Sequence, residues 1–470
     1  MGCDNMNNTY DILIVGASTT GCWFAHRMAK EGARVLVIEK NLPDDVSREY
    51  DIFHMGEGEM ERSGLVIPQE GNPIREFRFE RSNMSSPYAT VKIPGGYSPV
   101  IGMHKHDYIM LMADRAKKKG AEFIYGASFK DFIYDENNKI IGATYKTAEG
   151  EQTVNARLVA DCSGIPSAAR TKLPDSSIVE NFQLTPKDIL YVVLYYVTYK
   201  DKSINPADLN AFYMQYKSWF APAGEGYDGL MGIGSFYSYD SAEYVFHNHF
   251  KKNAKVPEYD LLKTEKGMTP YHRNLFSSID DNFIAMGDTA FLTKPTCGEG
   301  CTSSLVHGEI AAEVISKLIK DNKPLTKENM WSINTRYLRS QGKEFDSMRA
   351  LLKGVITISY DEAEYMFTND LLFSDKILGN IDDGINLSAK DIAHIIGGII
   401  KGITTGKIKA KTIKNLLTAL SNSGKVTKLY DTYPENYDGF AEWKQKAEAL
   451  WSQIGKVSDT CDEDIIRAGK

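Results

Sequence analysis

The sequence predicts an α/β protein in which a parallel sheet, an antiparallel sheet and a helical C-terminal region follow one another along 470 residues. Residues 10–15 and 35–39 are apolar runs typical of buried strands, and a helical pattern lies between them. Further strands are expected at 121–133, 138–147, 151–161 and 189–199. Beyond residue 330 the apolar residues recur at helical spacing, which predicts the helical region.

The composition describes an ordinary globular protein, with 42% hydrophobic and 25% charged residues. The net charge of −7 argues against a nucleic-acid partner. Six irregularly spaced cysteines give no disulfide framework, so a reducing cytoplasm is expected. We find no basic-then-apolar leader, and no apolar run reaches the roughly 20 residues that span a bilayer. A cytoplasmic protein is therefore expected.

A glycine turn joins the first strand to the first helix. Gly16 gives the sharp turn, and Gly21 lets the helix pack closely on the strand. The helix N-terminus then offers N–H groups and a positive dipole to a pyrophosphate. Glu39 ends the second strand, near the acidic position that holds a ribose hydroxyl in dinucleotide folds. The predicted dinucleotide contacts are Gly16, Ala17, Ser18, Thr19, Thr20, Gly21, Glu39 and Lys40.

Ser18 departs from the usual pattern, because a second glycine normally stands there and lets the backbone approach the phosphates. Its side chain must therefore point away from the phosphates, or its hydroxyl must replace a backbone contact.

Two later stretches also end a strand in an acid and a turn of small residues. The first runs from Leu158 through Asp161 to Arg170. The second ends in Gly287-Asp288, and a proline and two glycines then open a helix predicted for residues 301–320. This arrangement is a second place where backbone N–H groups can meet an anion.

Together the three stretches resemble the glutathione-reductase-type FAD proteins that have the p-hydroxybenzoate-hydroxylase fold. The resemblance implies a Rossmann-like FAD-binding domain, with the flavin-side ribose on Asp288. It also implies that the helix opened by glycines faces the flavin N1 and C2 carbonyl, where its dipole would stabilise an anionic reduced flavin. The further FAD contacts that it suggests are Arg48, His104, Asp161, Gly164, Gly287, Gly298, Gly300 and Cys301.

Within that group, the segment from Tyr216 to Pro222 looks like the Tyr–Trp–Pro strand of the geranylgeranyl reductase family. The segment from Leu429 to Trp443 resembles the closing helices of that family. The resemblance implies saturation of carbon–carbon double bonds in a hydrophobic isoprenoid lipid. Hydride would come from reduced flavin N5, and a nearby acid or water would supply the proton. The substrate-binding candidates are Tyr216, Trp219 and Phe220, which are either substrate wall or sheet core; no catalytic residue is assigned.

The predicted FAD-binding domain is discontinuous and covers residues 1–85, 104–180 and 265–330, with a β-meander inside it. Residues 86–103 and 181–264 form the predicted substrate sheet, and residues 331–470 form the helical region. Because the chain has a single dinucleotide fingerprint, electrons are expected from a ferredoxin-like protein or from NAD(P)H.

Several alternatives stay open. The fold also suits an FAD-dependent monooxygenase of aromatic substrates, and a non-catalytic flavin electron-relay protein is a third reading. Cys297 and Cys301 are either small side chains beside the cofactor or a thiol pair that exchanges electrons with it. No metal site is predicted. The apolar helix expected over 391–404 is interpreted as buried, with contact to a membrane surface left open.

Overall fold

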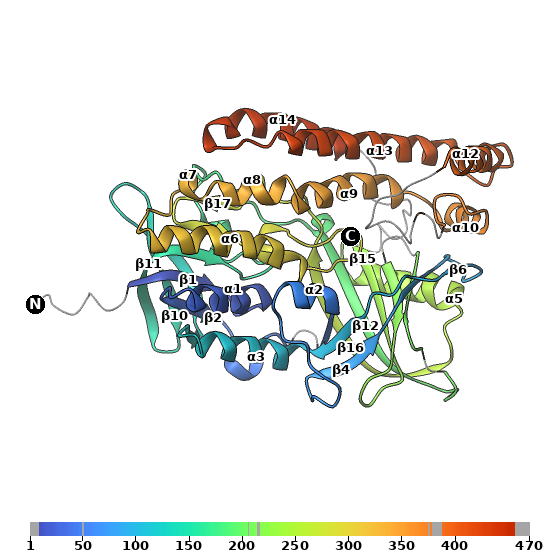
Figure 1. Cartoon of the computed structure of the whole chain (residues 1–470). Coiled ribbons are helices and arrows are strands. Elements are labelled where there is room, and N and C mark those ends of the chain that lie inside the picture. The colour runs from blue at the N-terminus through green and yellow to red at the C-terminus, as the bar shows by residue number, and fades with distance from the viewer. Residues whose placement is uncertain are drawn as a thin grey trace, which may run out of the picture.

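The computed structural model describes residues 9–48, 51–204, 206–213, 217–374, 377 and 388–455. Figure 1 shows two sheet regions side by side, with helices layered over them. The C-terminal helices α13 (Ala410–Asp431) and α14 (Phe440–Ile454) form the outer layer, and α8 (Ser332–Leu338) and α9 (Gln341–Val355) lie beneath them (Figure 1). The mixed α/β fold and its helical C-terminal region are as predicted.

The first sheet has eight strands, and its central path runs β17-β18-β11-β1-β2-β8. The strands β18, β11, β1, β2 and β8 are parallel to one another, so their carboxyl ends share one edge. The bounds are β1 Thr9–Val15, β2 Val35–Glu39, β8 Glu122–Tyr125, β9 Ser128–Tyr134, β10 Ile140–Thr147, β11 Gly150–Asp161, β17 Ile279–Asp280 and β18 Phe283–Ala285.

The predicted β-meander is present as the antiparallel strands β9, β10 and β11. The single strand expected over 121–133 is wrong, because two strands occupy it. Gly126 adopts a φ of +66° between them, and this left-handed turn sends β8 to pair with β2 while β9 joins the meander.

Three helices cover the first sheet and share its apolar core, which includes Leu13, Phe24 and Ile315. They are α1 (Thr19–Lys30), α3 (Lys105–Lys117) and α6 (Ser303–Lys320). A Cβ at Gly308 of α6 would lie 2.9 Å from the Trp23 ring. The glycine therefore lets α6 pack closely against α1.

The second sheet has seven strands in the order β16-β12-β15-β14-β13-β5-β6. The strand expected at 189–199 is confirmed as β12, whose side chains alternate between two apolar clusters. Val193 and Tyr195 lie in the cluster shared with α4 (Tyr239–Val245) and α10 (Tyr360–Thr368). Leu194 and Tyr196 face the third sheet. The bounds are β5 Ser82–Ser85, β6 Lys92–Ile93, β12 Ile189–Tyr199, β13 Leu209–Phe212, β14 Lys217–Ala221, β15 Gly229–Phe236, β16 Tyr259–Pro270, α4 Tyr239–Val245 and α5 Lys251–Asn253.

A third sheet of three strands, β3-β7-β4, stands between the other two. Its strands β3 and β4 lie within residues 41–80, where no strand is predicted from the sequence, because their pairing with β7 is not visible in the local pattern. The bounds are β3 Ile52–Gly56, α2 Glu57–Arg62, β4 Arg75–Phe79 and β7 Val100–His104.

The expected C-terminal helices are confirmed, but the interpretation of residues 391–404 as a buried helix is wrong. The helix α12 (Ala389–Thr404) buries only Gly402 fully. In the parts of the chain that the structure describes, no helix is long and apolar enough to cross a membrane. The remaining helical segments are α7 Lys327–Met330, α10 Tyr360–Thr368, η1 Pro43–Asp45, η2 Arg170–Lys172, η3 Pro186–Asp188, η4 Phe246–Phe250, η5 Gly287–Ala290 and η6 Tyr437–Gly439.

Candidate functional site

The site lies at the carboxyl ends of the parallel strands β1, β2, β11 and β18, the edge at which open α/β sheets bind ligands. At the first of these ends, Gly16 has a φ of +103°. A Cβ at Gly21 would lie 2.1 Å from the Gly16 carbonyl oxygen. Only glycine at position 21 therefore lets α1 begin this close to the turn.

Ser18 is the N-cap of α1, and its Oγ accepts a hydrogen bond from the Gly21 N–H at 3.1 Å. The hydroxyl therefore satisfies an N–H group at the helix N-terminus. The side chain is directed toward its own helix, and the choice between the two alternatives for Ser18 stays a prediction.

Glu39 is buried at the end of β2, where its carboxylate joins two segments. One oxygen accepts from the Ala17 N–H at 2.8 Å, and the other accepts from the Asn41 N–H at 2.9 Å. Each carboxylate oxygen has a second lone pair, so the group can brace the glycine turn and still accept from a ribose hydroxyl.

The stretches near Gly16 and Gly287, far apart in the sequence, meet at Thr20. The Thr20 Oγ1 lies 2.9 Å from the Ser304 Oγ at the start of α6. Gly287 has a φ of +64°, and a Cβ there would lie 2.9 Å from the same Thr20 oxygen. The two glycine-containing turns therefore form one site.

Asp288 lies deep in this site, in η5. Its Oδ1 accepts from the Thr293 Oγ1 at 3.0 Å, and a Cβ at Gly300 would lie 2.9 Å from that same oxygen. Burial raises the pKa of Asp288, and the charge of Lys105 opposes this rise. Among the described residues no donor reaches Oδ2, which leaves this oxygen for a ligand hydroxyl. The residues therefore fit the ribose of a dinucleotide.

The N-terminus of α6 carries a carboxyl group that the sequence reasoning did not single out. Glu299 accepts hydrogen bonds from the Thr302 N–H at 2.7 Å and the Ser303 N–H at 3.3 Å. Burial, and to a lesser degree the charge of Glu59, raises the pKa of Glu299. Two of the N–H groups expected to face the flavin carbonyl are thus taken by an acid of the same chain.

The FAD binding domain family matches residues 9–322 of the chain. The chain belongs to this family. A digeranylgeranylglycerophospholipid reductase of Sulfolobus acidocaldarius is 21% identical over 463 residues, which cover 95% of this chain and 98% of that protein.

Two solved structures show the same fold. A geranylgeranyl bacteriochlorophyll reductase-like protein from Thermoplasma acidophilum has a TM-score of 0.66 at 18% identity, covering 88% of this chain and 99% of its own. Aklavinone-11 hydroxylase in complex with FAD and aklavinone has a TM-score of 0.55 at 15% identity, covering 76% of this chain and 69% of its own. The predicted resemblance to the geranylgeranyl reductases is confirmed, and the protein is an FAD-dependent oxidoreductase.

Asp161 and Gly164, both predicted FAD contacts, shape the loop after β11. The Asp161 carboxylate is fully buried and accepts from the N–H groups of Ser163, Ala169 and Arg170. Its oxygens are thus engaged in holding the loop. Gly164 has a φ of +78°, and its N–H donates to the Thr289 Oγ1 at 3.1 Å. This bond fastens the loop to η5, next to Asp288.

Arg48 and His104, both predicted FAD contacts, interact with residues that are not neighbours of Asp288. Arg48 is exposed and donates from Nε to the Asp44 carbonyl at 3.0 Å, and Lys40 is exposed too. The His104 Nε2 lies 2.9 Å from Glu76. The cation whose charge acts on both Asp288 and Cys301 is the next residue, Lys105.

Lys105 is the first residue of α3, and no local pattern in the sequence marks it as a residue of the site.

Cys297 and Cys301 are both free thiols. Burial raises the pKa of Cys301 to about 12, so its thiol stays protonated and weakly nucleophilic near neutral pH. Among the described residues, no group of three or more His, Cys, Asp or Glu side chains could hold a metal ion.

The substrate candidates on β14 face opposite sides of the second sheet. Trp219 lies in the cluster between the second and third sheets, where a Cβ at Gly232 would lie 2.0 Å from its ring. Phe220 points to the other side and packs with Phe212 and Phe250, with ring centroids 5.4 and 5.1 Å away. Tyr216 lies outside the described residues.

We expect His307 of α6 to make stability depend on pH. The ring is buried with its Nε2 2.9 Å from the Ser278 Oγ, and burial lowers its pKa from 6.5 to about 4. Between these values the unfolded chain binds a proton that the native protein does not. The free energy of unfolding should therefore decrease as the pH is lowered from 6.5 toward 4, by about 1.4 kcal/mol per pH unit. Urea unfolding of the protein and of His307→Gln at pH 7 and pH 5 measures this contribution.

The His307→Gln variant should lose less stability than the parent over that interval. The variant His394→Gln, at an exposed position of α12, should behave like the parent. Equal losses in the parent and in His307→Gln would contradict the prediction.

Proposed function

We propose that this FAD-dependent reductase saturates carbon–carbon double bonds of an isoprenoid lipid. The observation that carries the proposal is the match along nearly the whole length of both this chain and the reductase of Sulfolobus acidocaldarius. The name of that protein specifies a phospholipid with two geranylgeranyl chains. The proposal is supported by the apolar cluster around Trp219, which lies between the third sheet and the antiparallel second sheet.

Bound FAD, once reduced, supplies a hydride to the double bond. The protein's own share is to position the cofactor, to exclude water and to supply a proton. Glu299 is a fitting acid because its raised pKa favours the protonated carboxyl. Glu59 stands beside it, since the Thr302 hydroxyl donates to Glu59 at 3.4 Å and the Thr302 N–H donates to Glu299. We propose this pair of carboxyl groups as the source of the proton.

We further propose that electrons arrive from a ferredoxin-like protein or from NAD(P)H. The support is the sequence, in which a single glycine fingerprint with a following acid is present. Stopped-flow reduction with each donor under anaerobic conditions would distinguish the two.

The test of the proposed activity is reoxidation of the reduced protein without oxygen. We expect that a geranylgeranylated phospholipid in detergent restores the oxidised flavin spectrum and gains hydrogen, as seen by mass spectrometry. A fully saturated phytanyl analogue should leave the flavin reduced. Consumption of NADPH and oxygen with an aromatic substrate would instead support a monooxygenase, and no reoxidation by any substrate would support an electron-relay protein.

The aromatic neighbours on β14 give a matched pair of variants. We expect Trp219→Ala to slow lipid-dependent reoxidation by roughly tenfold, equivalent to about 1.4 kcal/mol. The substitution removes an aromatic side chain proposed to contact the lipid, on the side of the second sheet that faces the third sheet. FAD content should be unchanged.

Phe220→Ala is the control, because its ring packs on the far side of the same strand. It should lower the unfolding midpoint while leaving the reoxidation rate near that of the parent. The role of Trp219 is rejected if both variants reoxidise at the same rate.

A further inference from the structure

The helices α12 and α13 present an unusual apolar surface, which we name the α12–α13 patch. Six of the fourteen exposed large hydrophobic side chains of the described residues belong to it. In α12 they are spaced by four, four and three residues, so they form one stripe along the helix. The patch consists of Ile392, Ile396, Ile400, Ile403, Leu417 and Leu420, with exposures between 37 and 62%.

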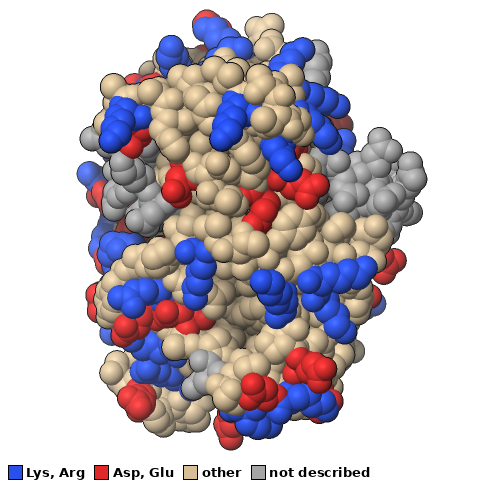
Figure 2. Space-filling model, turned by 90° about the vertical axis from the view of Figure 1, so that its right-hand side faces the viewer, with Lys and Arg blue, Asp and Glu red and all other residues tan. Residues whose placement is uncertain are grey.

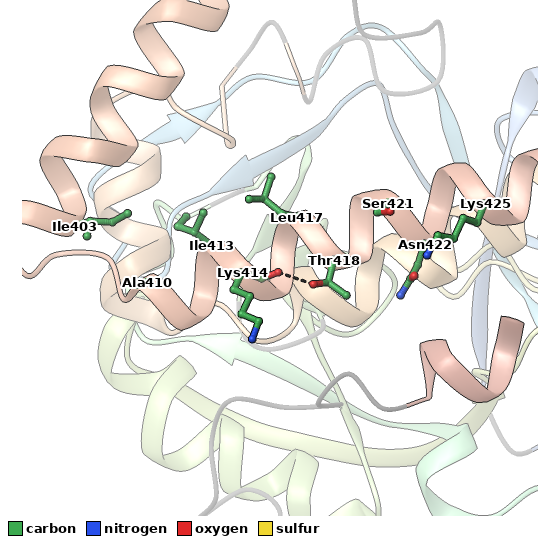
Figure 3. Close-up of a pocket in the computed structure, with 9 residues that line it drawn as sticks. All are labelled: Ile403, Ala410, Ile413, Lys414, Leu417, Thr418, Ser421, Asn422 and Lys425. Carbon is green, nitrogen blue, oxygen red and sulfur yellow. Dashed lines mark hydrogen bonds between the residues drawn. The ribbon is translucent and has the colours of Figure 1, made fainter.

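The stripe continues into an open groove of about 530 Å³ between the two helices. Figure 3 shows Ile403 from α12 and Ile413 and Leu417 from α13 around this groove. Lys414 and Lys425 line the same groove, about three turns apart along α13 (Figure 3). The groove thus combines hydrocarbon side chains with positive charge.

Charge is strongly uneven in this region. Residues 388–431 contain eight lysines and two aspartates, a net charge of +6 in a chain whose total is −7. All eight lysines are exposed. Some exposed lysines elsewhere pair with acids, as Lys263 does with Asp51, but no described carboxylate forms an ion pair with any of these eight. In Figure 2, which views the end of the molecule where α12 lies, Lys and Arg side chains border a broad uncharged area at the top.

The inner side of α12 packs against the antiparallel second sheet and against α10. Ile399 packs in the cluster that also contains Val193 of β12 and Ile233 of β15. The Tyr365 hydroxyl of α10 donates to the Gly398 carbonyl at 3.2 Å. The patch is therefore the outer surface of the region that holds the antiparallel sheet.

We propose that the α12–α13 patch docks this protein on a lipid surface with anionic headgroups. An isoleucine stripe flanked by lysines is the pattern of a helix that lies in the membrane interface. A second copy of the chain is a poor occupant, because it would place two regions of charge +6 against each other. An acidic soluble protein would match the charge, but it would leave the isoleucine stripe without hydrocarbon to contact.

The inference rests on the proposed function for its purpose, since docking would bring the protein to its lipid substrate. Its test is binding alone and needs no turnover. The full-length protein loaded with FAD is sedimented with vesicles of phosphatidylcholine, or of phosphatidylcholine mixed with phosphatidylglycerol. We expect binding to the mixed vesicles at low salt, weak binding to phosphatidylcholine alone, and release as salt rises.

The double variant Ile396→Ser/Ile400→Ser should bind the mixed vesicles at least roughly tenfold more weakly. Its control is Leu261→Ser/Leu262→Ser on β16, with exposures of 51 and 52% but outside the patch. Lys414→Gln/Lys425→Gln should also weaken binding, whereas Lys118→Gln/Lys119→Gln at the end of α3 should not. Retained FAD absorbance and an unchanged unfolding midpoint show that each variant is folded.

The inference is overturned if the protein ignores mixed vesicles at low salt, or if patch and control variants bind equally. It is also overturned if the patch variants abolish a dimer in solution while vesicle binding persists. A protein that binds vesicles through the patch but reduces no prenyl lipid would retain the docking surface and refute the proposed function. A protein that reduces lipid in detergent but binds no vesicles would support the proposed function and refute the docking surface.

Discussion

Arg349→Met is expected to destabilise the protein by about 3–5 kcal/mol, because it leaves a buried carboxylate without its cation. Arg349 and Asp346 of α9 lie 3.1 Å apart, with side-chain exposures of 3 and 0%. Asp346 also accepts from the Asn274 N–H at 3.0 Å and from the Tyr430 hydroxyl at 2.6 Å. The pair thus ties α9 both to α13 and to the segment before β17.

The same substitution should weaken FAD retention. Arg349 donates to the carbonyl oxygens of Phe291 at 3.1 Å and Thr293 at 2.6 Å. Thr293 in turn holds the carboxylate of Asp288. Without the guanidinium the loop after η5 loses its anchor on α9, so Asp288, the predicted ligand of the flavin-side ribose, is held less firmly. Urea unfolding and the ratio of flavin to protein after gel filtration measure the two effects.

Arg336→Met is the matched control. Arg336 in α8 pairs with Glu313 at 2.7 Å, but the two side chains are 44 and 65% exposed. Removing such a surface pair should cost less than about 1 kcal/mol and leave FAD in place. Similar unfolding midpoints for Arg349→Met and Arg336→Met would show that the buried pair does not hold this region together.

Some parts of the candidate site can be predicted from short stretches of the sequence. The glycine turn at Gly16, the acid at Glu39 and the Gly287-Asp288 turn each combine a strand end with residue types that need that geometry, so a local pattern identifies them. The strand over 189–199 is equally local, because its β-branched and aromatic residues run without a break.

What the sequence could not predict depends on pairing between distant segments. Glu299 caps its own helix beside Glu59, and Lys105 acts on Asp288 across the site, but neither has a local pattern that marks it. The strands β3 and β4 pair with β7 across intervening loops. The isoleucines of α12 look like core residues in the sequence, and only the packing of Ile399 and Gly402 inward shows that the stripe faces outward.

Gly21→Ala is expected to give a protein that folds without its yellow cofactor. A Cβ there would lie 2.1 Å from the Gly16 carbonyl oxygen, a backbone atom that cannot move aside without opening the turn. Either α1 or the turn must shift, and this shift displaces the N–H groups at the start of α1, which are predicted to bind the pyrophosphate. Since overpacking costs about 1–3 kcal/mol, the dissociation constant for FAD should rise by roughly 5- to 150-fold. Fluorescence titration of the apoprotein with FAD measures this change.

Gly397→Ala separates this clash from the general effect of adding a methyl group to a helical glycine. Nothing lies within 4 Å of a Cβ at Gly397, so alanine there should leave FAD binding unchanged and raise stability by about 0.5–1 kcal/mol through its better helix propensity. If Gly21→Ala instead binds FAD as tightly as the parent, the turn between β1 and α1 does not hold the pyrophosphate. The cofactor would then have to depend on Asp288 and the α6 side of the site.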